Sequence, residues 1–250
     1  MNGVLVVNDL SVRYRNKSII TGINLSLPLN SLMTILGPSG VGKSTLLRTL
    51  NRLIDEEEGF SRSGKIFYRG KDVDCEIALT TLRRNIGIIL QKPVIFPISI
   101  FKNVIFGIHH LGLKPRKDYP DIVEGLLKKV SLWEEVSDRL HASALELSAG
   151  QQQRLAIART LALEPNILLA DEITSSLDGE SSGKIEKLLI ELKTTHSIIV
   201  VTHQVEQALR LSDSIMCLEN VEGAGKMDFW GTPDKYYKIR TTAKNGSNLI

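Results

Sequence analysis

The first forty residues alternate apolar and polar positions in the way that strands do. In the run INLSLPL, the residues Ile23, Leu25 and Leu27 alternate with polar neighbours, which predicts a half-buried strand. The runs VLVV and LSVRY predict two more strands of this kind, and the continuously apolar run SLMTIL predicts a buried one. The chain is therefore expected to open with antiparallel strands and then to pass into a sheet core.

From Lys43 the spacing of apolar residues changes to that of a helix. The run KSTLLRTLNRLI places Leu46, Leu47, Leu50 and Leu53 on one helical face, directly after a glycine-rich segment. The short strand-like runs KIFYR and IGIIL then lead to Gln91. The order strand, glycine-rich loop and helix is typical of phosphate-binding sites.

Residues 92–163 have a helical pattern, and strands and helices alternate after them. Three helices are expected, over ISIFKNVIFGIHH, DIVEGLLKKVSLWEEVSDRL and SAGQQQRLAIARTLAL. The runs NILLAD, SIIVVTH and SIMCLE then predict strands, and SSGKIEKLLIELKTT and QVEQALRLS predict the helices between them. This alternation indicates a parallel sheet with crossover helices, interrupted by a helical insertion.

Composition and charge narrow the class of protein. The chain has 250 residues, of which 42% are apolar and 24% charged, as in ordinary globular proteins. Its 31 basic and 28 acidic residues form no long basic block, so nucleic acid is not an expected partner. No apolar run is long enough for a membrane helix, and MNGVLVVNDL lacks the features of a signal peptide, which predicts a cytosolic chain. Cys75 and Cys217 have no metal-binding spacing and are interpreted as reduced, structural thiols.

The glycine-rich segment is a candidate phosphate loop. The run GPSGVGKST fits the pattern G-x-x-x-x-G-K-[ST] and stands between a predicted buried strand and a predicted helix. Backbone N–H groups of such a loop surround an oligophosphate, Lys43 adds a positive charge, and Ser44 is placed to ligate Mg²⁺. A chance glycine-rich turn is the alternative, and the flanking strand and helix disfavour it. The candidate residues are Gly37, Pro38, Ser39, Gly40, Val41, Gly42, Lys43, Ser44 and Thr45.

Polar residues at the ends of other predicted strands complete a candidate reaction site. In NILLADE, Asp171 and Glu172 follow a buried strand, and they are predicted to hold Mg²⁺ and to polarise an attacking water respectively. His203 follows the strand SIIVV and is predicted to reach the γ-phosphate or that water. Gln91 follows IGIIL and is a further Mg²⁺ ligand and a hinge in this hypothesis. An exposed acidic pair, a strand-end histidine and a strand-end amide are the corresponding structural alternatives.

The run LSAGQQQR predicts the start of a helix. Ser148 and Gln151 have the spacing of a capping box before an apolar stripe, which is a sufficient structural explanation for these two residues. It leaves Gly150 and the other glutamines unexplained. A second phosphate-binding helix end, formed by Ser148, Gly150 and Gln151, is the functional interpretation.

The motifs GPSGVGKST, Gln91, LSAGQ, ILLADE, SSLD and His203, in this order, resemble the ATPase subunit of ATP-binding cassette transporters. The resemblance implies a P-loop NTPase core of α/β class with a mostly parallel sheet, an antiparallel β subdomain and an inserted α-helical subdomain. The corresponding ranges are 1–91 and 164–240 for the two parts of the ATP-binding core, 92–163 for the helical subdomain and 241–250 for a flexible tail.

The resemblance also implies ligands and partners. ATP and Mg²⁺ are the expected cofactors, with Lys43, Glu172 and His203 as the catalytic groups and Ser44, Gln91 and Asp171 at the metal. Two ATPase subunits face head to tail, as a homodimer or pseudo-dimer, so that LSAGQ of one closes over the ATP of the other. Membrane permease subunits, and through them an extracytoplasmic solute-binding protein, are the other partners, which implies a peripheral position on the cytoplasmic face of the membrane.

Further residues are assigned by the resemblance alone. Tyr14 matches the aromatic residue that stacks on adenine, with an ordinary strand tyrosine as the alternative, and 175–178 match the loop that connects the two ATP sites. The segment KPVIFPISIF beside Gln91 is a candidate groove for a permease helix, or else ordinary packing of the helical subdomain.

Within the family, the ATPases of phosphate importers are the most similar group. LNRLIDE, SLWEEVSDRLH and the triple glutamine carry this resemblance. Ala149 stands where the group usually has glycine, Ile173 where it usually has proline, and the stretch from Lys71 to Ile77 is shorter. Ala149 and Ile173 lie at the expected ATP site, so the closing of the dimer is expected to be sensitive to them.

Three functions remain open at this point. The leading one is an ATPase that drives uptake of a small solute, phosphate first, with an amino acid or another oxyanion as alternatives. The second is an ATPase of the same superfamily that acts as an assembly factor without transport. The third, a nucleotide-binding regulator, is disfavoured because Glu172 and His203 are both present.

Overall fold

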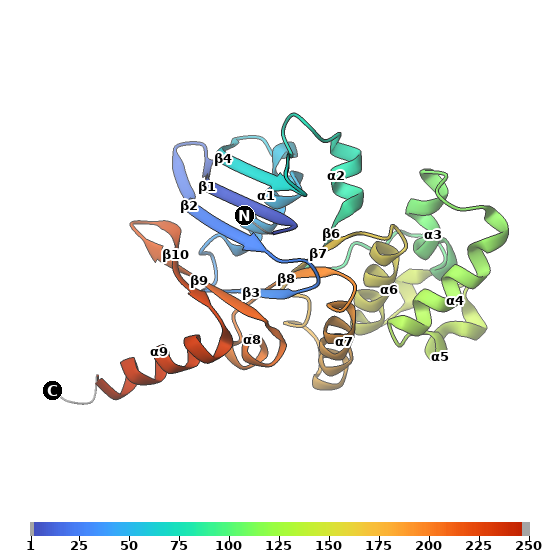
Figure 1. Ribbon diagram of the computed structural model, residues 1–250. Coiled ribbons are helices and arrows are strands. Elements are labelled where there is room, and N and C mark those ends of the chain that lie inside the picture. The colour runs from blue at the N-terminus through green and yellow to red at the C-terminus, as the bar shows by residue number, and fades with distance from the viewer. Residues whose placement is uncertain (1–2, 247–250) are drawn as a thin grey trace.

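The computed structural model describes residues 3–246, in which strands and helices follow one another from end to end (Figure 1). The strands are β1 (Leu5–Tyr14), β2 (Lys17–Leu27), β3 (Leu32–Leu36), β4 (Phe60–Tyr68), β5 (Lys71–Asp72), β6 (Ile86–Ile89), β7 (Ile167–Asp171), β8 (Ser197–Thr202), β9 (Ser214–Val221) and β10 (Ala224–Gly231). The α-helices are α1 (Lys43–Leu50), α2 (Leu79–Asn85), α3 (Ile100–His110), α4 (Tyr119–Lys129), α5 (Trp133–Val136), α6 (Ala149–Leu161), α7 (Gly179–Leu192), α8 (Val205–Leu211) and α9 (Pro233–Gly246). Short 3₁₀ helices are η1 (Leu53–Glu56), η2 (Arg116–Asp118), η3 (Ser137–Arg139) and η4 (Ala144–Glu146).

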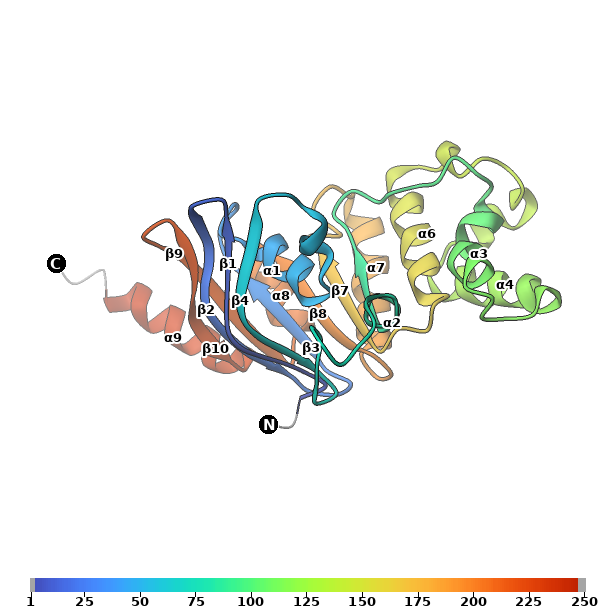
Figure 2. The ribbon, with the colours of Figure 1, turned by 90° about the horizontal axis from the view of Figure 1, so that it is seen from above.

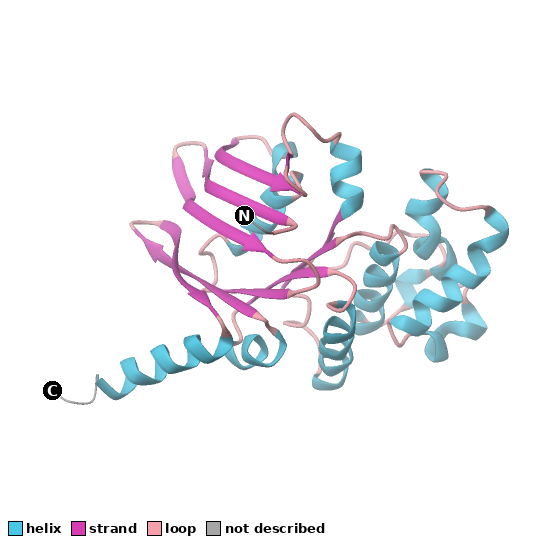
Figure 3. Cartoon of the chain, viewed as in Figure 1, coloured by secondary structure: helices cyan, strands magenta, loops and turns pink. Residues whose placement is uncertain are grey.

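All strands join one ten-stranded sheet in the order β5-β4-β1-β2-β10-β9-β3-β8-β7-β6. Strands β9, β3, β8, β7 and β6 are parallel, as the alternation of strands and helices predicted. Strands β1, β2, β4 and β5 are antiparallel, and β10 joins the two parts by pairing with both β9 and β2. Figure 3 shows the strands in two tiers, with the antiparallel strands above the parallel ones. The predicted α/β class with a mostly parallel core and an antiparallel subdomain is confirmed.

Helix α1 lies between the two parts of the sheet. Its apolar residues Leu46, Leu47 and Leu50 are fully buried in one cluster with residues of β1, β2 and β4 on one side and of β3, β7 and β8 on the other. Each such leucine contributes about 1.5–3 kcal/mol through burial. Packing from both sides fixes the helix, and therefore also the glycine-rich loop that precedes it.

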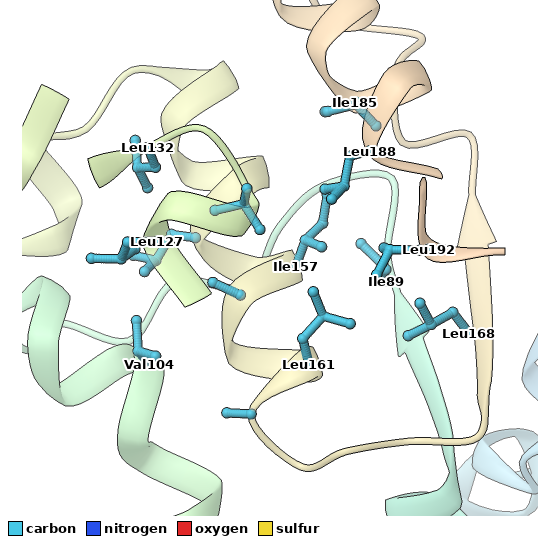
Figure 4. Packing of buried hydrophobic residues seen from close by; sticks show 14 of the residues in the cluster. Ile89, Val104, Leu127, Leu132, Ile157, Leu161, Leu168, Ile185, Leu188 and Leu192 are labelled. Carbon is cyan, nitrogen blue, oxygen red and sulfur yellow. The ribbon is translucent and has the colours of Figure 1, made fainter. Parts of the chain in front are cut away.

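Helix α6 joins the helical region to the core. Ile157 and Leu161 belong to a second buried cluster, which contains Leu127 of the helical region as well as Leu168 of β7 and Leu188 of α7 (Figure 4). Seen from above, α3 and α4 lie at the end of the molecule away from α9 (Figure 2). The second half of α6 is thus packed between the helical region and the core.

The structure differs from the predicted elements in several places. The two short strands predicted before Tyr14 form the single strand β1, with a bulge at Asp9, where φ is 49°. The helix predicted over 121–140 is divided into α4, α5 and η3, because Ser131 takes a left-handed φ of 53°. Helix α2, strand β10 and helix α9 were not predicted, because their apolar residues are too few or too irregular to show a period.

The last described helix, α9, includes part of the segment that was predicted as a tail. Helix α9 continues to Gly246, so that the segment 241–250, predicted as a tail, begins inside this helix and its last four residues lie outside the described range. Within 3–246, no helix has both the length and the apolar composition needed to cross a membrane.

The two cysteines differ in accessibility, which gives a testable difference in reactivity. Cys75 is exposed, Cys217 is buried, and both are free thiols. Burial raises the pKa of Cys217 to about 11. At pH 8 we therefore expect a thiol reagent to modify Cys217 at least about 10²-fold more slowly than Cys75, because the thiolate is the reacting form and Cys217 is also buried.

Mass spectrometry after timed labelling measures both rates, and a Cys75→Ser chain isolates the buried thiol. Unfolding in guanidinium should remove the difference. Equal labelling rates in the folded chain would show that Cys217 is open to solvent.

Candidate functional site

The glycine-rich loop lies at the carboxyl end of β3 and leads into α1. Gly42 is the residue before this helix and has φ 103°, and a Cβ atom at this position would meet Ile20 Cγ2 at 2.5 Å. Both observations require glycine, because a side chain would be strained and would also clash. The loop can therefore pack tightly on β2 and present its N–H groups and the amino end of α1 on the open side.

Lys43 is the buried cation of the loop. Its side chain is 4% exposed, and Nζ donates hydrogen bonds to the carbonyl oxygens of Gly37 at 2.9 Å and Pro38 at 3.0 Å. Nζ also lies 3.4 Å from Glu172 Oε1. The ammonium group is thus held over the loop by groups of the chain itself, at the place where an oligophosphate would lie.

Ser44 and Asp171 meet although they are 127 positions apart. Ser44 Oγ donates a hydrogen bond of 2.8 Å to Asp171 Oδ1. Burial raises the pKa of Asp171, the hydrogen bond from Ser44 opposes this, and the charge of Glu172 adds to it. A buried carboxylate beside a hydroxyl is a pair that a cation would stabilise.

Glu172 lies between the two basic side chains of the site. Its Oε1 atom faces Lys43 at 3.4 Å, and its Oε2 atom lies 3.5 Å from His203 Nδ1. The residue has a left-handed φ of 47°, and its N–H donates to Val201 O at 3.0 Å, which holds it against β8. With this uncommon backbone conformation the Glu172 side chain reaches Lys43, while Asp171 contacts the next residue of the loop, Ser44.

Gln91 reaches the same site from the end of β6. Its Nε2 donates to Ser175 Oγ at 3.1 Å, and Ser175 Oγ in turn donates to Glu172 O at 2.9 Å. The amide of Gln91 is therefore connected to the backbone of Glu172 through one hydroxyl. Ser175 was recognised in the sequence as part of SSLD. Its contact with Gln91 could not be predicted, because the two residues are far apart in the chain.

A pocket of about 460 Å³ lies at the glycine-rich loop. It is lined by Ile19, Ser39, Gly40, Gly42, Lys43, Ser44, Thr45, Gln91 and Glu172. Ile19 of β2 was not predicted, because one apolar residue in an apolar strand carries no signal of a site. His203 lines an adjoining pocket with Gly37 and Pro38.

Tyr14 lies near the end of β1, where its ring packs against Phe60 at a centroid distance of 4.9 Å. It is partly exposed, and it is not among the residues that line the pocket around Lys43. Its assignment as the adenine contact stays a prediction.

The start of α6 has the predicted capping box. Ser148 Oγ accepts from Gln151 N at 3.4 Å, and Gln151 Oε1 accepts from Ser148 N at 2.9 Å. Gly150 is buried against α7, since a Cβ atom there would meet Ser181 Oγ at 2.6 Å. Ser148, Gly150 and Gln151 do not line the pocket around Lys43 of their own chain.

The donor set fits a magnesium ion bound together with a triphosphate. Among residues 3–246, no group of three or more His, Cys, Asp or Glu side chains is arranged to hold a metal. Ser44 and Asp171 offer one hydroxyl and one carboxylate in contact. Mg²⁺ is usually bound by one or two such groups together with phosphate oxygens and water, so a cage made only of protein groups is not needed.

Comparison with known proteins agrees with this geometry. Residues 20–175 match the family model described as ABC transporter. The chain is 47% identical over 211 residues to the phosphate import ATP-binding protein PstB of Borreliella burgdorferi, a match that covers 84% of this chain and 81% of that protein. It is also 47% identical over 213 residues to phosphate import ATP-binding protein PstB 2 of Bacillus subtilis, which covers 85% and 79% respectively.

Solved structures have the same fold. The structure of cbiO1 from Clostridium perfringens, described as part of the ABC transporter complex cbiONQ, superposes with a TM-score of 0.80 at 28% identity, over 100% of this chain and 96% of that one. A bacterial Atm1-family ABC exporter with ATP bound gives a TM-score of 0.79 at 26% identity, over 94% of this chain and 40% of that one. The resemblance predicted from the motifs is confirmed: this chain belongs to the ABC transporter family, as an ATP-binding ATPase subunit.

Proposed function

We propose that this chain powers a phosphate importer by hydrolysing ATP in a dimer of ATPase subunits. The assignment of ATP hydrolysis is supported by the position of Glu172 in the pocket at the glycine-rich loop. Its carboxylate faces Lys43 on one side and His203 on the other. The choice of phosphate is supported by the 47% identity to proteins named as phosphate import ATP-binding proteins.

In this proposal the loop 37–45 binds the phosphates of ATP, with Lys43 as the cationic contact. Lys43 now donates to two carbonyl oxygens and lies near Glu172, and incoming phosphates compete with these groups for it. Ser44 and Asp171, with Gln91, hold Mg²⁺, which neutralises phosphate charge when bound. Tyr14 contacts the adenine.

The same proposal assigns the proton transfer to Glu172. Its carboxylate accepts the proton of the attacking water, and the neighbouring His203 is placed to contact the γ-phosphate or that water. The side chain of Glu172 is 16% exposed, so it is largely shielded but still borders the pocket. In this proposal the amino end of α6, with Ser148, Gly150 and the backbone of Gln151, completes the site of a second subunit, and these residues do not line the pocket of their own chain.

A groove of about 270 Å³ between the core and the helical region is the proposed permease contact. Gly87 and Ile88 of β6 line one side, and Phe96, Gly107 and Arg159 line the other. Val94 beside it is 54% exposed, as expected for the segment after Gln91. In this proposal 92–163 form a helical subdomain inserted between core parts 1–91 and 164–240, and the subunit lies on the cytoplasmic face of the membrane.

Phosphate-dependent stimulation of ATP hydrolysis tests this function. The chain is reconstituted in vesicles with the permease subunits and the solute-binding protein encoded beside it, and ATP turnover is measured with and without each solute. Phosphate is expected to raise turnover several-fold, and sulfate or an amino acid is expected to leave it unchanged.

Stimulation by another solute would replace phosphate in the proposal while keeping the importer. If the chain co-purifies with no membrane protein, the assembly-factor function replaces transport. A complex that carries Glu172→Gln serves as the inactive control.

A further inference from the structure

Glu135 of α5 has no part in the site described so far, yet it connects three helices. Its carboxylate accepts a hydrogen bond from Gln151 Nε2 at 2.9 Å and two from Arg154 Nη2, at 2.9 Å and 2.8 Å. Lys184 of α7 approaches the same carboxylate, with Nζ 3.7 Å from Oε1. An acidic side chain surrounded in this way is a fixed element of the structure rather than a solvated surface charge.

The contact with Gln151 fixes the orientation of this amide. Gln151 Oε1 accepts a hydrogen bond from the backbone N–H of Ser148, and Gln151 Nε2 donates one to the Glu135 carboxylate. Both ends of the side chain are therefore used within the chain. Gln151 is then a residue that shapes the start of α6, and its side chain is not free to reach a nucleotide.

The contact with Arg154 keeps Glu135 in place. Arg154 is 3% exposed, and its Nε and Nη1 atoms lack a hydrogen-bond partner among residues 3–246. A buried guanidinium with so few partners depends strongly on the one carboxylate that it has. The attraction draws Glu135 over the first turns of α6, where Gln151 lies one turn before Arg154.

The same end of α6 also packs on the core. Gly150 allows the close approach of Ser181 at the start of α7, and Lys184 of α7 pairs with both Glu135 and Glu180. The amino end of α6 is thus held between α5 and α7 by a close backbone contact on one side and by Glu135 on the other.

We propose that Glu135 is a positioning residue for ATP closure, acting through Gln151 on the end of α6 that faces the ATP of the partner subunit. This inference rests on the proposed function, because only a dimer with sites shared between subunits makes the orientation of this end matter. Glu135 is not expected to affect ATP binding by its own subunit, since it does not line the pocket around Lys43.

ATP-driven dimerisation in the Glu172→Gln background tests the inference. Glu135→Gln is compared with Glu134→Gln, which makes the same charge change at an exposed position of the same helix. We expect Glu135→Gln to raise the ATP concentration for half-maximal dimerisation about tenfold, because a charge-assisted hydrogen bond to Gln151 is replaced by a weaker one. Glu134→Gln should leave it unchanged, and the ATP affinity of the monomer should be the same in all variants.

A double-variant cycle separates positioning from a general structural effect. If Glu135 acts through Gln151, its substitution has little further effect once Gln151→Leu has removed the amide. Because a buried Arg154 without its carboxylate can unfold the chain, the pair Glu135→Leu with Arg154→Met provides a second variant that retains apolar packing. This pair is expected to stay folded, as judged by thermal unfolding, and to show the same loss of dimerisation.

The outcomes distinguish the inference from the function on which it rests. Normal dimerisation of folded Glu135 variants, or additive effects of Glu135→Gln and Gln151→Leu, would overturn the positioning role alone. Equal weakening of ATP binding by the monomer would also overturn it. If the Glu172→Gln chain with intact Glu135 forms no ATP-dependent dimer, the shared site of the proposed function fails, and the positioning role fails with it.

Discussion

Replacing Glu172 by glutamine is expected to lower steady-state ATP hydrolysis about 10²-fold or more, with ATP binding retained. The amide has the size of the carboxylate, so it fits the space between Lys43 and His203. It cannot accept the proton of an attacking water, and this removes the step that we assign to the carboxylate. ATP then remains bound across two subunits, and a stable dimer should accumulate, because ATP favours the closed state only while its γ-phosphate is present.

The prediction is checked by measuring ATP turnover, nucleotide affinity and oligomeric state on one preparation of the Glu172→Gln variant. Glu191→Gln is a suitable control, because Glu191 is an exposed glutamate near the end of α7 that lines neither the pocket around Lys43 nor the one around His203. Its variant should match the unmodified chain in all three measurements. Unchanged turnover in Glu172→Gln would mean that another group accepts the proton.

The parts of the site that were predicted correctly share a physical feature. A phosphate loop depends on local rules, because glycines at fixed spacing permit the turn and a helix must follow it. The meeting of Ser44 and Asp171 follows from topology, because the carboxyl ends of parallel strands lie at one edge of a sheet. Neither prediction needs the detailed packing of side chains.

Other features depend on contacts between segments that are distant in the sequence. Glu135 was seen only as part of the segment SLWEEVSDRLH, and its contacts with Gln151 and Lys184 require that three helices be placed together. The capping box at Ser148 was predicted from its spacing. The hydrogen bond from Gln151 Nε2 to Glu135 had no signal in the local sequence. In the same way, β10 was missed because it is stabilised by pairing with β9 and β2 more than by its own apolar period.

The structure shows different requirements for a small residue at Ala149 and at Gly150. Gly150 is buried and faces Ser181, so a side chain there would push α6 away from α7. Ala149 is exposed at the first position of α6, where alanine is a good helix former. Within one chain the departure at Ala149 is therefore well tolerated, and its effect on closure depends only on the space that the partner's ATP leaves.

Replacing Lys43 by methionine is expected to reduce ATP affinity about 10²-fold, a second large effect on the same site. Lys43 is the buried cation of the phosphate loop, and charge-assisted hydrogen bonds to a ligand contribute about 1.5–3 kcal/mol each. Methionine keeps the length and the apolar stem of the side chain but donates no hydrogen bond. Calorimetric titration with MgATP measures the affinity, and the thermal unfolding midpoint with saturating MgATP measures the lost stabilisation.

A loss of folding must be separated from this loss of binding. Without Lys43 the carboxylate of Glu172 loses its nearest cation, and the carbonyl oxygens of Gly37 and Pro38 lose a donor. The chain without ATP should therefore be destabilised, and adding Glu172→Gln should restore part of its stability by removing the unpaired charge. ATP affinity should not recover in this double variant, because the missing contact is the one to the phosphates. If affinity recovers together with stability, Lys43 supports the loop and contributes little to phosphate binding.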